Sequence, residues 1–117
     1  MAVLALDAHP LWVHHVGVKT PSHSLERIRA AAAAGELEVT GTAGHEAAEV
    51  GYGYEEICAV VAALTPRRFV KSVESTLVEG EWQDVYKVPI RKGKLFVKVT
   101  ITAEVLVLSF RLDWETP

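Results

Sequence analysis

The second half of the chain alternates between apolar and polar residues in four consecutive segments. These segments are 69–73, 82–86, 93–100 and 106–111. A period of two is typical of β-strands with one buried face, and consecutive strands joined by short turns pair antiparallel. The pattern therefore predicts one antiparallel sheet with an apolar core face and an outer face that carries Lys, Gln, Ser, Thr and Arg side chains.

The turns predict how these strands pair. A two-residue turn at 103–104 sets Thr102 opposite Val105 in the last hairpin. Because side chains alternate between faces, this register assigns each strand a core face and an outer face. On the core face Val97, Val99 and Ile101 then meet Phe110, Leu108 and Leu106, and on the outer face Phe96, Lys98 and Thr100 meet Arg111, Ser109 and Val107.

A second turn, at 92–93, predicts the register of the preceding hairpin. It places three more side chains on the outer face beside Phe96 and Arg111, namely Gln83, Val85 and Lys87. The same register sets Lys87 opposite Lys98. Directly opposed like charges destabilise a sheet unless an anion lies between them, so the outer face is a candidate anion-binding surface.

The first half of the chain has helical periodicity. Capping residues at 20–24 precede a helix that begins near Leu25 and ends at Gly35, and further helices are expected over 42–50 and 54–64. Thr65-Pro66 supplies the N-cap and first residue of one more turn. Helices first and strands last predict an α+β fold with the helices packed on one face of an antiparallel sheet.

Charge is distributed unevenly between the two halves of the chain. The net charge is −3, but residues 1–64 carry −5 and residues 65–98 carry +4. A uniformly basic nucleic-acid binder is therefore excluded. A local basic face on the sheet half is still able to bind RNA, with weaker long-range steering than a basic protein would have.

Cysteine, histidine and hydropathy exclude several other classes. Cys58 is the single cysteine, in an apolar run, which indicates a small buried hydrophobe and a reducing compartment such as the cytoplasm. His9, His14 and His15 lack the cysteine or carboxylate spacing of a metal site, so we expect no metal or other cofactor. The opening 1–6 is apolar but lacks a basic flank, so neither a signal peptide nor a membrane span is expected.

The residues of the sheet half resemble those of the MqsR (motility quorum-sensing regulator) toxin family. The resemblance covers about residues 20–112 and rests on Thr20-Pro21, Ala34-Gly35, Leu64, Phe69-x-Lys-Ser72, Trp82-Gln-Asp-Val-Tyr86, Gly93, Val97-Lys-Val-Thr100 and Ser109-Phe110. It implies a RelE-like α+β ribonuclease toxin domain over 20–117. Residues 1–19 then form an N-terminal extension, in which 11–18 is expected to add a strand or a packed arm.

The resemblance also implies a function and a site. It implies a metal-independent endoribonuclease that cleaves messenger RNA and is held in check by a partner antitoxin, with no small-molecule cofactor. Family active sites use a Lys, a Gln, a Tyr and a second Lys, and these positions are Lys71, Gln83, Phe96 and Arg111 in this chain. Lys87 and Lys98 on the same predicted face are candidate RNA-binding residues.

Phe96 leaves two functional interpretations open. Phenylalanine lacks the hydroxyl of the family Tyr, although its ring is able to stack on a base. Tyr86 does not replace it, because alternation aims Tyr86 at the opposite face from Gln83. The first interpretation is a cytoplasmic toxin that cleaves RNA by attack of the ribose 2′-OH on the adjacent phosphate. The alternative is a weakly active or inactive relative that serves as an antitoxin-binding module.

Overall fold

The structure is a computed structural model, and it describes residues 17–113. Two predictions fall largely outside this range, the histidines at 9, 14 and 15 and the arm at 11–18. At the end of that arm Val18 forms an antiparallel bridge with Ser72, and the Val18 amide donates to the Ser72 carbonyl oxygen at 2.7 Å. None of the helices described in 17–113 is long and apolar enough to cross a membrane.

The predicted helices are confirmed. They are α3 (Leu25–Ala33), α4 (Gly41–Glu49), α5 (Tyr54–Ala62) and the 3₁₀ turn η1 (Pro66–Arg68). Ser24 caps α3 by accepting a hydrogen bond from the Arg27 amide, and Thr40 caps α4 by accepting from the Ala43 amide. Gly35, at φ 71°, ends the first helical segment in a conformation that side-chain-bearing residues rarely adopt.

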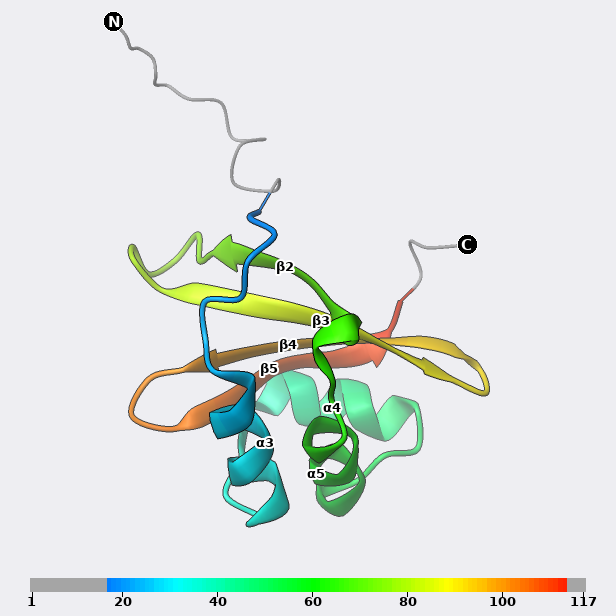
Figure 1. Cartoon of the computed structure of the whole chain (residues 1–117). Coiled ribbons are helices and arrows are strands. Elements are labelled where there is room, and N and C mark those ends of the chain that lie inside the picture. The colour runs from blue at the N-terminus through cyan, green and yellow to red at the C-terminus, as the bar shows by residue number, and fades with distance from the viewer. Residues whose placement is uncertain (1–16, 114–117) are drawn as a thin grey trace, which may run out of the picture.

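Four strands lie where the alternation predicts them, and a fifth was not predicted. The predicted strands are β2 (Phe69–Glu74), β3 (Trp82–Ile90), β4 (Gly93–Ile101) and β5 (Val105–Leu112). The additional strand β1 (Glu38–Val39) pairs parallel with β5, so the order is β1-β5-β4-β3-β2 and the sheet is mixed. The fold is α+β as predicted, and in Figure 1 the helices lie on the lower side of the sheet.

The register of the β4–β5 hairpin is correct near its open end and wrong near its turn. Phe96, Val97 and Lys98 pair with Arg111, Phe110 and Ser109 as predicted. Beyond Lys98 a bulge shifts the pairing, so that Val99 faces Val107 and Ile101 faces Val105 across a three-residue turn. The bulge turns Val105 and Val107 into the core in place of Leu106 and Leu108.

The β3–β4 register differs from the prediction by two residues. The turn lies one position earlier, Ile90 pairs with Gly93, and Lys87 faces Phe96 while Lys98 faces Val85. The predicted Lys87–Lys98 pair is therefore wrong, and the observed register separates the two charges. A shift of two residues leaves every side chain of β3 and β4 on its predicted face, so these two strands contribute the predicted residues to the outer face.

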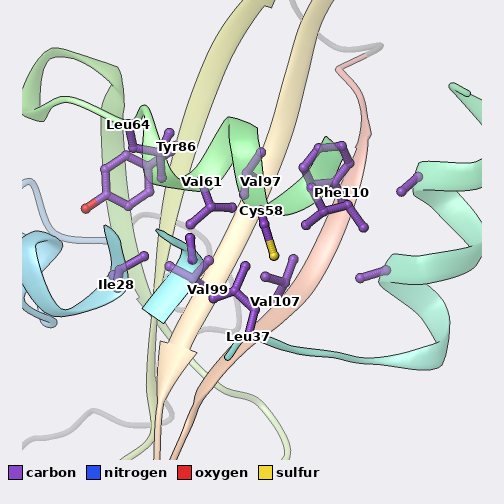
Figure 2. Packing of buried hydrophobic residues seen from close by; sticks show 14 of the residues in the cluster. Ile28, Leu37, Cys58, Val61, Leu64, Tyr86, Val97, Val99, Val107 and Phe110 are labelled. Atoms are coloured by element: carbon purple, nitrogen blue, oxygen red, sulfur yellow. The ribbon is translucent and has the colours of Figure 1, made fainter. Parts of the chain in front are cut away.

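The core lies between the inner face of the sheet and the helices. Figure 2 shows Ile28, Val61 and Leu64 from the helical half packed with Tyr86, Val97, Val99 and Phe110 from the strands. Cys58 belongs to this cluster and is buried, as its apolar neighbours predict. Tyr86 also lies there, with its ring edge against Phe69 at 5.6 Å between centroids. Its orientation away from the outer face is thereby confirmed.

A buried carboxylate ties the segment before α3 to the sheet. Asp84 on β3 is fully buried, and its oxygens accept hydrogen bonds from the Ser22 amide at 3.0 and 3.1 Å and from the His23 amide at 2.9 Å. The Ser22 and Ser72 hydroxyls add a contact at 2.6 Å. These bonds set the start of α3 against β2 and β3.

Replacing Tyr86 with phenylalanine is expected to stabilise the protein. The Tyr86 hydroxyl is buried and finds no hydrogen-bond partner among the described residues, so its removal should raise the free energy of unfolding by about 1 kcal/mol at neutral pH. Burial raises the pKa of Tyr86 to about 12. The unfolded chain releases this proton near pH 10, so wild-type stability should fall between about pH 10 and 12, by about 2–3 kcal/mol.

Urea unfolding at pH 7 and across pH 9–12 measures both effects. The alkaline loss should be smaller in Tyr86→Phe than in the wild type. A variant that is less stable at pH 7, with the same alkaline loss, would show that the hydroxyl is satisfied in solution.

Candidate active site on the outer sheet face

The sheet face turned away from the helices is hollowed. The hollow has a volume of about 560 Å³ and is bordered by the end of β2 and the loop that follows it, residues 74–77. Its floor and walls include five of the six predicted site residues, Lys71, Gln83, Phe96, Lys98 and Arg111. Cations and an amide contributed by β2, β3, β4 and β5 thus gather in one place.

Strand pairing explains why these side chains meet. One row across the sheet runs from Lys71 through Val85 and Lys98 to Ser109. A second row runs from Lys87 through Phe96 to Arg111, and Gln83 pairs with Val73 on the other side of the first row. Val85 separates the two lysines of the first row. Its side chain is only 1% exposed, although it is not part of the hydrophobic core cluster.

Arg111 is held over the ring of Phe96. The guanidinium carbon lies 4.2 Å from the ring centroid, and one terminal nitrogen donates to the Leu112 carbonyl oxygen at 3.1 Å. A cation over an aromatic face is attracted by the negative ring face. Phe96 therefore positions a permanent positive charge in the hollow, although it offers no proton of its own.

Lys98 lies where its surroundings disfavour a positive charge. Burial lowers the pKa of Lys98, and the nearby charges of Arg111 and Lys71 lower it further, whereas the carboxylate of Glu46 acts in the opposite direction. Desolvation and like charges both disfavour an ammonium ion. The ammonium group of Lys98 is thus a stronger acid than that of an ordinary lysine.

Glu46 is a site neighbour that the sequence reasoning missed. It projects from α4, and its Oε1 accepts hydrogen bonds from the Phe110 amide at 2.9 Å and from the Ser109 hydroxyl at 3.0 Å. The two-residue strand β1 covers only Leu106 and Val107 of β5, so Glu46 satisfies a backbone amide farther along that edge. Helical spacing alone gives no signal that this carboxylate reaches the sheet.

Lys87 is on the predicted face but is engaged by another side chain. Its Nζ lies 2.8 Å from Oδ2 of Asp113, whose side chain is fully buried. Asp113, just beyond the last strand, was also missed by the sequence reasoning. The role of Lys87 in RNA binding stays a prediction.

The arrangement suits an anionic, phosphate-bearing ligand. Arg111 presents a planar fork that matches two phosphate oxygens, and Lys71 and Lys98 add point charges. Within 17–113 no group of three His, Cys, Asp or Glu side chains is placed to hold a metal ion. The side chains of this face are able to bind a phosphodiester and to stabilise charge that develops on its oxygens.

Known proteins share sequence similarity with this chain over most of its length. The family model described as the motility quorum-sensing regulator, toxin of MqsA, matches residues 20–112. The chain is also 30% identical over 93 residues to the mRNA interferase toxin MqsR of Escherichia coli (strain K12), an alignment that covers 80% of this chain and 95% of that protein. The match spans every helix and strand described above, and it leads to one conclusion: the chain belongs to the MqsR family of toxins.

Proposed function

We propose that the hollow on the outer sheet face is the catalytic centre of this toxin and that it cleaves messenger RNA without a metal ion. Membership of the MqsR family makes the chain an endoribonuclease toxin of a toxin–antitoxin pair. The observation that carries the proposed site is the gathering of Lys71, Lys98 and Arg111 around one hollow with Gln83. We place the protein in the cytoplasm, where its messenger RNA target and its antitoxin partner would meet it.

The reaction that fits these side chains is an internal transesterification. The ribose 2′-oxygen attacks the adjacent phosphorus, and the bond from phosphorus to the 5′-oxygen of the next nucleotide breaks. Negative charge increases on the phosphoryl oxygens in the transition state. Arg111 and Lys71 are the cations that stabilise this charge. Arg111 suits the role because a guanidinium does not deprotonate at physiological pH.

Gln83 and Phe96 are assigned to positioning the RNA. The Gln83 amide is able to hydrogen-bond a phosphate oxygen or a base edge. The Phe96 ring is partly covered by the guanidinium of Arg111, so a base would stack beside this pair on an extended flat surface.

The proposal is tested by the chemistry of the cleaved ends. Purified protein incubated with a messenger RNA transcript in excess EDTA is expected to yield fragments with 2′,3′-cyclic phosphate and 5′-hydroxyl ends. Loss of cleavage on chelation, or fragments with 5′-phosphate ends, would contradict a metal-independent attack by the 2′-oxygen.

Replacing Phe96 with tyrosine is expected to raise the cleavage rate. The side chain lines the hollow and is partly exposed, so a hydroxyl fits with little steric cost and adds a hydrogen-bonding or proton-transferring group. Single-turnover rates of the wild type and Phe96→Tyr on the same transcript measure the effect. If the variant is no faster than the wild type, a hydroxyl at position 96 does not contribute to catalysis.

Phe96 also supports a second candidate function. The missing hydroxyl removes an acid–base group from the family position, which favours a weakly active or inactive relative whose task is to bind an antitoxin. A wild type without detectable cleavage, together with an active Phe96→Tyr variant, would support this second function over the first.

A further inference from the structure

Lys98 is one of the three cations that line the hollow. It lies on β4 between Val85 of β3 and Ser109 of β5, in the same row as Lys71 of β2. It is also two residues from Phe96, so both side chains point to the same face of the strand. A group on Lys98 therefore reaches the space beside the ring of Phe96.

Charged groups from three different elements face Lys98. Arg111 of β5 is a diagonal neighbour on the adjacent strand, about 7–8 Å away between Cα atoms by sheet geometry. Lys71 of β2 lies two strands away, and Glu46 of α4 reaches Ser109 from the edge of the sheet. The two cations and partial burial favour loss of the Lys98 proton, and the carboxylate favours its retention.

We propose that Lys98 is the general acid that protonates the 5′-oxygen leaving group, the proton-transfer role that Phe96 is unable to fill. The proposal rests on the function proposed above, because it assigns one step of that cleavage. A 5′-alkoxide is a poor leaving group, and a positioned acid accelerates its departure by about 10²–10⁴-fold.

The step balances without a further reactant. A bond forms between the ribose 2′-oxygen and phosphorus, and the bond between phosphorus and the 5′-oxygen breaks with its electron pair going to that oxygen. The 5′-oxygen takes a proton from Nζ of Lys98, and the 2′-hydroxyl proton passes to water. The products are a 2′,3′-cyclic phosphate and a 5′-hydroxyl, and solvent then returns a proton to Lys98.

The surroundings of Lys98 make it a better proton donor than the other two cations that line the hollow, Arg111 and Lys71. Giving up its proton removes one of three neighbouring positive charges, so Arg111 and Lys71 assist the transfer. Arg111 itself holds its proton too tightly to act as an acid near neutral pH. Lys71 remains a cation that binds the phosphate.

A substrate with a sulfur leaving group separates acid catalysis from phosphate binding. The cleaved bond is first mapped by sequencing the 5′ ends of transcript fragments. Two oligonucleotides are then made around that bond, identical except that one carries sulfur in place of the bridging 5′-oxygen. A thiolate leaves without protonation, so a defect in the acid affects the oxygen substrate only.

Lys98→Arg keeps the positive charge but removes a readily donated proton. We expect it to slow cleavage of the oxygen substrate by at least about 100-fold, while its rate on the sulfur substrate stays within about threefold of the wild type. The wild-type kcat/KM on the oxygen substrate should fall as pH rises through the lowered pKa of Lys98, and this fall should be absent with sulfur. Lys98→Gln also removes the positive charge, so it should slow both substrates, and the oxygen substrate more than the sulfur substrate.

The control is Lys94→Arg, because Lys94 is an exposed lysine on the same strand and face but outside the lining of the hollow. It should leave both rates unchanged. Equal slowing of both substrates by Lys98→Arg, or no slowing of either, would overturn the acid assignment and leave the proposed function standing. A wild type that cleaves neither substrate would instead contradict the proposed function, and the acid assignment with it.

Discussion

Arg111→Ala is expected to lower the rate of RNA cleavage by at least about tenfold, which corresponds to about 1.4 kcal/mol of lost transition-state stabilisation. The guanidinium lies over Phe96 and lines the hollow, where its charge would meet the phosphoryl oxygens as negative charge grows on them. Lys71→Ala removes a second cation from the same hollow and should lower the cleavage rate by a similar factor. Single-turnover rates on one transcript in EDTA measure both.

The matched control for this prediction is Arg91→Ala. Arg91 is exposed in the turn between β3 and β4 and does not line the hollow. It should retain the wild-type rate, and thermal melting should show that all three variants fold. Wild-type rates in Arg111→Ala and Lys71→Ala would contradict the assignment of the catalytic cations.

Asp84→Ala is expected to lower the free energy of unfolding by about 3 kcal/mol or more. The substitution leaves the Ser22 and His23 amides without the buried carboxylate that accepts from them, and hydrogen bonds to a buried charge contribute about 1.5–3 kcal/mol each. Asp84→Asn keeps one acceptor oxygen and should lose less. Urea unfolding midpoints measure the difference.

Glu79→Ala is the matched control, since Glu79 is an exposed acid in the loop between β2 and β3. Its stability should stay within about 0.5 kcal/mol of the wild type. A loss of the same small size in Asp84→Ala would show that the segment before α3 is held by other contacts.

Periodicity predicted the elements of this fold because most of them bury one face. The alternation of apolar and polar residues over 93–100 and the helical spacing of apolar residues after Leu25 both show a buried face within a short stretch of chain. The strand β1 escaped prediction because two residues, Glu38 and Val39, are too few to show any period. The bulge in β5 escaped as well, since Val105 to Leu108 are all apolar and either alternate set satisfies a core face.

The side chains that β3 and β4 contribute to the outer face were predictable even though the pairing of these strands was not. In a strand without a bulge, face depends only on whether a position is odd or even, so the two-residue error that misplaced Lys87 opposite Lys98 left both on the outer face. Glu46 and Asp113 were not predictable in the same way. Each reaches its partner through contacts between elements distant in sequence, for which local spacing holds no signal.

The most direct measurement of the central claim is a crystal structure with an uncleavable RNA. An oligonucleotide spanning the mapped cleavage position, with a 2′-O-methyl group on the attacking ribose, would trap the bound substrate. We expect its scissile phosphate in the hollow, within hydrogen-bond distance of Arg111 and Lys71, with its 5′-oxygen directed at Lys98. A scissile phosphate bound on the helical side of the sheet, or away from these three cations, would contradict the account.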